Sequence, residues 1–146
     1  MIKLNLPPFE YKLKNSENKM FIFDVIRKKY IQLTPEEWVR QHWLHYLINK
    51  KHYPKSLIGV EKQVLVNKLK KRADIIIYNK FGKPNLVVEC KAYNVKITQM
   101  VFDQIARYNL SLQAKFLVLS NGLNHFFAAF DSKTKSVTQI DDIPKY

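Results

Sequence analysis

The middle of the sequence, residues 72–92, reads RADIIIYNKFGKPNLVVECKA, and this stretch decides the fold. Two apolar segments within it, 73–79 and 86–92, are rich in Val and Ile, as half-buried or buried strands are. The segment 80–84 between them contains Gly82 and Pro84, which is typical of a turn. The pattern therefore predicts an antiparallel β-hairpin at the centre of the protein.

On the N-terminal side of this hairpin the sequence predicts a helix followed by a strand. Thr34 is a good N-cap, Pro35 suits the first helical position, and Glu37 completes a capping box. Apolar residues at helical spacing continue to Ile48, and a strand is expected at 58–66. Before Thr34, two short strand-like segments at 9–13 and 20–26 predict an N-terminal β-hairpin.

On the C-terminal side, Thr98 is expected to cap a second helix that ends near Leu112, and strands follow at 116–119 and 126–130. The core order is therefore helix, three strands, helix, two strands (αβββαββ), which predicts an α/β sandwich around a central mixed sheet. We expect a single domain over residues 1–146, with an N-terminal strand extension at 1–33 and the core at 34–131.

The chain is strongly basic, with 25 Lys and Arg residues against 12 Asp and Glu residues and a net charge of +13. Such an excess favours an anionic partner, usually a nucleic acid, because Lys and Arg release counterions condensed on phosphate. The alternative is a basic protein kept soluble by its charge. The sequence has one cysteine, no signal-peptide pattern and no apolar segment of roughly 20 residues, so we expect a cytoplasmic protein with no membrane association.

Charged residues interrupt the two apolar strands of the central hairpin. Glu89 and Lys91 are two residues apart, so in a strand both point to one face, while Cys90 points to the other as a small buried residue. Asp74 lies in the preceding strand, across the turn. A magnesium ion held by Asp74 and Glu89 would offset the cost of burying these charges, and Lys91 would orient or deprotonate a water molecule.

A simpler explanation uses the same residues without a metal. Asp74 or Glu89 could form a salt bridge with Arg72 or Lys91, and the spacing alone does not separate the two explanations. Glu61, in the strand expected at 58–66, is predicted to pair with Arg72 and not to be catalytic.

Asp74 followed by Glu89-Cys90-Lys91 resembles the PD-(D/E)xK nuclease signature, with Ala73 where the name of the signature has proline. Segments 33–41, 72–74, 88–92 and 103–109 resemble the N-terminal nuclease domain of type I restriction enzyme R subunits, over roughly residues 20–131. The resemblance implies a restriction-endonuclease-like fold, DNA as substrate, hydrolysis of a phosphodiester and Mg²⁺ as cofactor, with Mn²⁺ as a substitute. It implies that Asp74, Glu89 and Lys91 are catalytic and that the Cys90 carbonyl joins Asp74 and Glu89 as a metal ligand.

The same resemblance suggests roles for three more residues. Gln104 and Tyr108 match the QxxxY motif of RecB-like members, which lies beside the active site and the DNA backbone. Alternatively, they are an interior polar pair that ties the helix to the sheet. Many members add an acidic metal ligand from the first helix, here Glu37 with Glu36 as the substitute, although Glu37 also fits the capping box.

A run of basic residues leads into the strand of Asp74, at the place where a DNA backbone would pass to reach the metal. We expect this run to bind DNA, although charge runs are usually solvated surface. Its members are Lys68, Lys70, Lys71 and Arg72.

Together these patterns predict a Mg²⁺-dependent DNA nuclease of restriction or repair type. The alternative is a DNA-binding or interaction module on the same fold that is catalytically silent or depends on a partner. Type I R subunits continue into a helicase motor, whereas this sequence has no phosphate-binding glycine loop, so we expect no DNA translocation by the chain itself. A homodimer, or a helicase or restriction–modification partner subunit, is the expected assembly.

Overall fold

The structure, a computed structural model, describes residues 1–66 and 69–146. A six-stranded sheet in the order β4-β5-β6-β7-β8-β9 forms the body of the molecule, and only the β6–β7 pair is parallel. Its strands are β4 (Ile58–Val66), β5 (Leu69–Tyr78), β6 (Pro84–Cys90), β7 (Phe116–Ser120), β8 (His125–Asp131) and β9 (Ser136–Ile140). The predicted central hairpin is β5 and β6, with its turn at 79–83.

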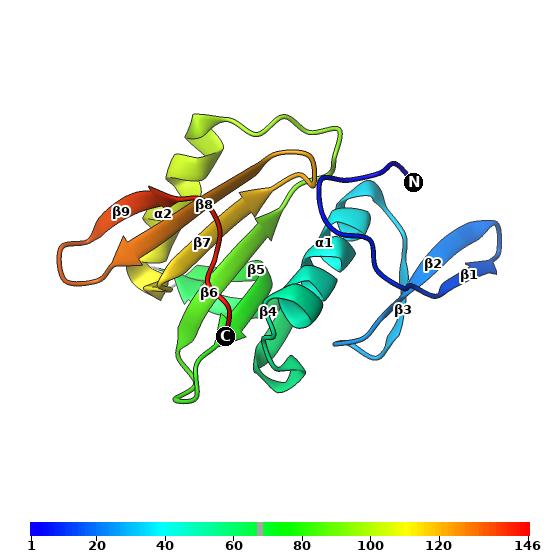
Figure 1. Cartoon of the computed structure of the whole chain (residues 1–146), viewed down its shortest axis with the longest axis horizontal. Coiled ribbons are helices and arrows are strands. Elements are labelled where there is room, and N and C mark those ends of the chain that lie inside the picture. The colour runs from blue at the N-terminus through cyan, green and yellow to red at the C-terminus, as the bar shows by residue number, and fades with distance from the viewer. Residues whose placement is uncertain (67–68) are drawn as a thin grey trace.

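Two helices cover opposite faces of this sheet (Figure 1). Helix α1 (Pro35–His45) continues into a short π-helix, η1 (Tyr46–Lys50), and the 3-10 turn η2 (Lys55–Leu57) leads into β4. Helix α2 (Gln99–Leu112) connects β6 to β7. Ile75, Ile77 and Val88 pack on the α1 side, whereas Ile76 and Val87 pack on the α2 side, so consecutive strand residues alternate between two cores.

Both helices begin at the residues that the sequence predicts. The Thr34 hydroxyl accepts a hydrogen bond from the Glu37 amide at 3.1 Å, and Thr98 does the same for the Val101 amide at 3.3 Å. None of the helices in residues 1–66 and 69–146 is long and apolar enough to cross a membrane.

The N-terminal extension differs from the predicted hairpin. It is a three-stranded antiparallel sheet of β1 (Leu13–Ser16), β2 (Lys19–Asp24) and β3 (Lys29–Gln32). The apolar run 20–26 was expected to be one strand, but Asp24 ends it, because its carboxylate accepts hydrogen bonds from the amides of Ile26 and Arg27. This turn reverses the chain and adds β3 beside β2.

The main sheet also has one strand more than the predicted order αβββαββ. β9 follows β8 through a turn in which the Asp131 carboxylate accepts the Lys133 amide at 2.9 Å. Four of its five residues are exposed, so the strand carries little of the apolar pattern by which a buried strand is recognised. The α/β sandwich around a mixed sheet is confirmed, and its sheet continues through β9 to Ile140.

Candidate active site

The β5–β6 hairpin opens at the end where Asp74 and Glu89 lie. The ladder pairs Ile75 with Val88 and then stops, although the register would place Asp74 opposite Glu89. The amide of Cys90 has no backbone carbonyl partner on β5, and it instead donates to the side-chain oxygen Oδ2 of Asp74 at 2.7 Å. The two strands therefore separate at this end, and the Asp74 carboxylate fills the gap between them.

The face alternation of β5 breaks at the same point. Ala73 packs on the α2 side together with Ile76, whereas Ile75 packs on the α1 side. On β4, Glu61 has a left-handed backbone with φ 52°, which costs on the order of 1–3 kcal/mol for a non-glycine residue. Glu61 lies where it would face Asp74, between the Val60–Ile75 and Lys62–Ala73 pairs. This irregularity turns both carboxylates toward α1, where both contact the same arginine.

Glu89 lies beside Asp74, in an environment that favours the protonated form of the Glu89 carboxyl. Burial and then the adjacent Asp74 carboxyl raise the pKa of Glu89 to about 8, while the ammonium groups of Lys91 and Lys71 lower it. Its Oε1 is buried, with no hydrogen-bond partner among the described residues. An unpaired buried carboxyl oxygen next to a second carboxyl is a site that a cation would stabilise.

Lys91 follows β6 directly and keeps its extended course. Its amide donates to the Ser120 carbonyl at 2.8 Å, which continues the parallel ladder with β7 by one bond. The positive charge of Lys91 lowers the pKa of both Glu89 and Glu36, so Lys91 lies within electrostatic range of both carboxylates. The structure thus places Asp74 beside Glu89, with Lys91 in range of Glu89.

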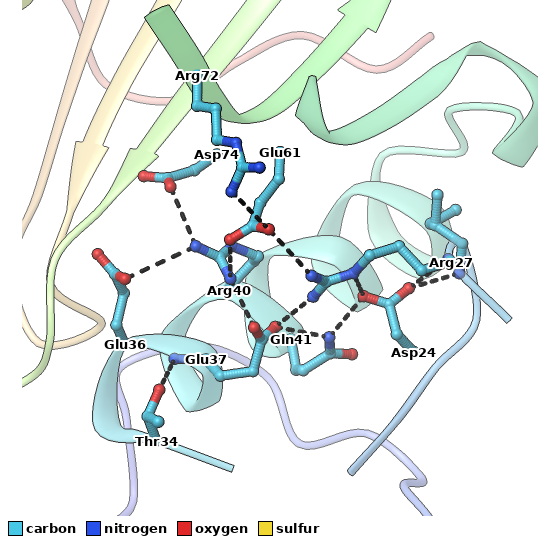
Figure 2. Close-up of polar contacts among 11 residues, drawn as sticks. Asp24, Arg27, Thr34, Glu36, Glu37, Arg40, Gln41, Glu61, Arg72 and Asp74 are labelled. Carbon is cyan, nitrogen blue, oxygen red and sulfur yellow. Dashed lines mark hydrogen bonds and ion pairs between the residues drawn. The ribbon is translucent and has the colours of Figure 1, made fainter. Parts of the chain in front are cut away.

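Arg40 of α1 is the centre of the acidic residues that face the opened hairpin (Figure 2). Its guanidinium donates to Asp74 Oδ1 at 3.0 Å and to Glu37, and it lies 3.7 Å from Glu36 and 3.5 Å from Glu61. Although burial alone would lower it, the carboxylates of Glu37 and Asp74 raise the pKa of Arg40 above its ordinary value. Arg40 therefore stays charged and occupies one of the two oxygens of Asp74.

The two acidic residues that open α1 face different surroundings. The Glu37 carboxylate is buried and accepts hydrogen bonds from Arg27 at 2.9 Å, Gln41 at 3.0 Å and Arg40. The Glu36 side chain is 47% exposed, and burial followed by the charge of Asp74 raises its pKa. Of the two, Glu36 is the one whose carboxyl is free to face the space near Asp74 and Lys91.

The sequence did not single out the residues that hold this network to the N-terminal sheet. Asp24 accepts from Arg27 Nε at 2.8 Å and from Gln41 Nε2 at 2.9 Å, and it is fully buried. One available signal was the polar pair Arg40-Gln41 between the apolar pairs Trp38-Val39 and Trp43-Leu44 of the helix. Their partners Asp74 and Asp24 are 34 and 17 residues away, so the spacing could not identify them.

Helix α2 closes the site from the other face. The buried Tyr108 hydroxyl has no hydrogen-bond partner among the described residues, and burial followed by the charges of Glu89 and Asp74 raises its pKa. The Lys71 ammonium lies over the Tyr108 ring, 4.6 Å from its centroid. Gln104, one turn earlier, is exposed on the same helix. The two QxxxY residues therefore differ, with Tyr108 in the site and Gln104 at its rim.

The remaining basic residues divide between the two faces of β5. Arg72 points to the α1 side, where it lies 3.6 Å from Glu61, as the sequence suggested for that pair. Lys70 is exposed beside them. Lys68, the first residue of the predicted DNA-binding run, lies outside the residues that the structure describes.

The residues of the site meet part of what a divalent cation requires. Within residues 1–66 and 69–146, no three His, Cys, Asp or Glu side chains form a group that could hold a metal by themselves. Magnesium, however, commonly uses one or two carboxylates and completes its shell with water and substrate oxygens. The Asp74–Glu89 pair with its unpaired oxygen fits that requirement. Cys90 offers only its backbone, because its buried side chain lies in the α1-side core and burial raises the pKa of the thiol well above its ordinary value.

Comparisons with known proteins identify a family and a similar solved structure. The family described as "Type I restriction enzyme R protein N terminus" matches residues 35–144. A fragment structure of an HsdR subunit of a type I restriction enzyme from Vibrio vulnificus YJ016 is similar, with a TM-score of 0.52 and 21% identity. That match covers 77% of this chain but 24% of the HsdR chain, so the protein spans about a quarter of the length of that structure. No curated protein matches the chain.

Proposed function

The chain belongs to the family of type I restriction enzyme R protein N termini, and from this we propose that it is a metal-dependent DNA nuclease that hydrolyses phosphodiester bonds. Membership makes it a nuclease-type domain, and the chemistry of its site supports the finer assignment. The observation that carries the proposal is the Asp74–Glu89 pair at the opened end of the hairpin, with an unpaired carboxyl oxygen and Lys91 beside it.

We assign metal binding to Asp74, Glu89 and the Cys90 carbonyl, with Mg²⁺ as the cation and Mn²⁺ as its substitute. A divalent cation there supplies a Lewis acid for the phosphate and makes a nearby water more acidic. It also neutralises the repulsion that raises the pKa of Glu89. Lys91 then orients the attacking water or stabilises the charge that grows on the phosphate oxygens.

The acidic ligand from the first helix is Glu36 in this proposal, and Glu37 holds the site together. Glu37 is already bonded to two arginines and a glutamine, and recruiting it would leave those buried donors unpaired. The Glu36 carboxyl is half-exposed, and its pKa is raised by Asp74, so it gains from a cation placed between them.

The DNA strand reaches this site along the β5 side of α2. Lys71 and Tyr108 lie together at its edge, and Gln104 is exposed one turn away. The exposed ammonium and amide groups of Lys71 and Gln104 can bond phosphate oxygens and position a backbone without reading sequence, while the buried Tyr108 hydroxyl stays on the side of Glu89 and Asp74. Lys68, Lys70 and Arg72 extend the same basic run in the sequence.

A second candidate is a DNA-binding or interaction module that does not cut by itself. The observation that favours it is the 3.0 Å contact between Arg40 and Asp74, because a guanidinium on a ligand oxygen competes with a metal ion. In that case a partner subunit or bound DNA would have to draw Arg40 away before metal could enter.

Cleavage assays with matched variants separate the two candidates. Plasmid, linear duplex and single-stranded DNA are incubated with the purified protein in Mg²⁺, in Mn²⁺ or in a chelator. We expect cutting that requires metal and falls by at least about a hundredfold in Lys91→Ala and Glu89→Gln. Lys83→Ala, which changes an exposed lysine in the β5–β6 turn, should cut like the unaltered protein.

A calorimetric titration with Mn²⁺ in the presence of uncleavable DNA completes the test. Heat of binding that disappears in Glu89→Gln supports a metal centre at Asp74 and Glu89. DNA binding without cutting or Mn²⁺ uptake under every condition would establish the module instead.

A further inference from the structure

The outer face of the small N-terminal sheet carries aromatic rings and lysines that neither core uses. We call this surface the aromatic–lysine face and define it by Lys12, Lys14, Phe21, Phe23 and Tyr30. The sheet lies outside the family match at 35–144, and it stands beside α1, apart from the main sheet (Figure 1). Its composition therefore cannot be explained by the site described above.

Strand register places these side chains on one face. Residues directly opposite each other in an antiparallel ladder share a face, and Lys14 pairs with Phe21 while Phe23 pairs with Tyr30. The opposite face holds Ile22, which is fully buried in the α1-side core. The sheet is thus fixed to the body by its inner face, and its outer face is left to solvent.

The rings on this face have no structural task among the described residues. Phe21, Phe23 and Tyr30 belong to neither core cluster and do not pack against one. Phe23 and Tyr30 contact each other edge to face with centroids 5.3 Å apart, and Tyr30 is 39% exposed. Apolar rings displayed together on a surface usually mark a binding site.

Lysines lie directly over these rings. The Lys14 ammonium is 5.6 Å from the Tyr30 centroid, and that of Lys12 is 5.9 Å from the Phe23 centroid. A depression of about 250 Å³ is lined by Lys14, Ser16, Phe21 and Tyr30. The face therefore offers flat rings for stacking, and cations on flexible stems that can move from a ring to a nearby anion.

We propose that the aromatic–lysine face binds an unpaired segment of nucleic acid, with bases stacked on Phe21 and Tyr30 and phosphates held by Lys12 and Lys14. Charge complementarity selects this occupant, because a single strand supplies a flat ring and a negative charge at every nucleotide. A duplex hides its base faces. An anionic membrane offers charge, but it needs apolar side chains that project into it, whereas the Phe23 and Tyr30 rings have lysine ammonium groups over them.

The test measures binding of fluorescent twelve-nucleotide oligo-dT and oligo-rU by anisotropy, in a chelator and with excess unlabelled duplex. Tyr30→Ala and Phe21→Ala are each expected to weaken binding of the single strand by about tenfold, which corresponds to the stacking of one base. Tyr30→Phe keeps the ring and should bind within about twofold of the unaltered protein. The two oligonucleotides show whether the sugar is discriminated.

Phe81 supplies a matched control elsewhere in the chain. It is an exposed aromatic residue in the β5–β6 turn, and the Lys80 ammonium lies 5.3 Å from its centroid, as in the Lys14–Tyr30 pair. Phe81→Ala should leave single-strand binding unchanged. Thermal unfolding of each variant shows whether the N-terminal sheet is still folded.

Photocrosslinking of an iodouracil oligonucleotide to the unaltered protein keeps the test independent of folding in the variants. Crosslinks mapped to residues 12–32 support the proposal. Crosslinks only elsewhere, equal affinity of Tyr30→Ala and Phe81→Ala, or binding to anionic vesicles without binding to oligonucleotides would overturn it. Binding is measured in a chelator, where no metal-dependent cleavage takes place, so a failure of the nuclease proposal is recognised separately.

Discussion

At the scale of single residues, Arg40 is the group on which the site depends most. It is buried and bonded to Glu37 and Asp74, so its loss removes a charged partner from both carboxylates and leaves Glu37 with Arg27 alone. We expect Arg40→Gln to lower the free energy of unfolding by about 3–5 kcal/mol, measured by urea denaturation. Arg72→Gln is the control, because the Arg72 side chain is 67% exposed and its single ion pair should contribute less than about 1 kcal/mol. Equal losses in the two variants would contradict the central role of Arg40.

Glu89 should make the stability of the metal-free protein depend on pH. Its pKa is about 8 in the folded state and 4.5 as an ordinary glutamate, so between these values the folded state keeps a proton that the unfolded chain releases. Its favourable contribution is therefore complete below pH 4.5 and is lost as the pH rises through 8. We expect Glu89→Gln to be more stable than the unaltered protein by on the order of a few kcal/mol at about pH 9, and to differ little at about pH 4.

The control for this experiment is Glu10→Gln, which changes an exposed carboxylate far along the chain from the site. Thermal unfolding is followed across the pH range in a chelator and then with Mn²⁺. Metal should raise the melting temperature of the unaltered protein at high pH and leave that of Glu89→Gln unchanged. A pH profile that is the same in both proteins would show that Glu89 ionises normally.

The alternation of strand residues allowed the strand part of the candidate site to be predicted from sequence. The acidic residue contributed by the first helix could not be chosen in the same way. Strand alternation predicts that Glu89 and Lys91 share a face, and in the structure Glu89 lies beside Asp74 with the charge of Lys91 acting on it. On a helix, adjacent residues differ by about 100° in direction, so sequence could not decide between Glu36 and Glu37. The contacts of Arg40 with Asp74 join residues 34 positions apart, and no local pattern reports such a pair.

At the scale of elements, α2 contributes to the site through one buried hydroxyl. Tyr108→Phe removes a hydroxyl that has no hydrogen-bond partner among the described residues, so stability should stay the same or rise by roughly 1 kcal/mol. Because that hydroxyl faces Glu89 and Asp74, cleavage should nevertheless fall by about tenfold or more. Denaturation and initial rates measured on the same preparation check both parts. A loss of stability without a loss of rate would make Tyr108 a packing residue.

Elements with strong local signals were predicted best. Both helix starts have a threonine cap, and the β5–β6 hairpin has an apolar strand on either side of a glycine turn. β3 and β9 were not predicted, because each is short and mostly exposed, and their residues show little alternation. The side-chain turn at Asp24 was the available signal for β3, since an aspartate at the end of an apolar run often closes a turn.

At the scale of the whole molecule, the charge of +13 should dominate affinity for DNA. If about four phosphates are contacted, affinity should fall by about a hundredfold between roughly 50 and 200 mM salt, measured by anisotropy with a short duplex. Lys71→Gln should reduce the slope by about one contact, whereas Lys145→Gln, in the exposed C-terminal segment, should leave it unchanged. Binding that is insensitive to salt would exclude phosphate contacts as the main source of affinity.

Assembly can be read from the products of cleavage. A single active site cuts one strand at a time, so a monomer should convert supercoiled plasmid to open circles before linear molecules appear. A homodimer should give linear product early and with a rate that rises steeply with protein concentration. Gel analysis of the products over a range of protein concentrations distinguishes the monomer from the homodimer.

The acidic residues are distributed unevenly over the protein, and this affects where a polyanion would bind. Half of the twelve acidic residues gather around Arg40 and the opened hairpin, namely Asp24, Glu36, Glu37, Glu61, Asp74 and Glu89. The rest of the exterior is therefore more cationic than the total charge suggests, and it attracts nucleic acid from most directions. At the proposed active site, the gathered carboxylates would repel phosphate. A divalent cation bound at the proposed site would offset this repulsion. The metal concentration would then determine where a bound strand is positioned, as well as whether it is cut.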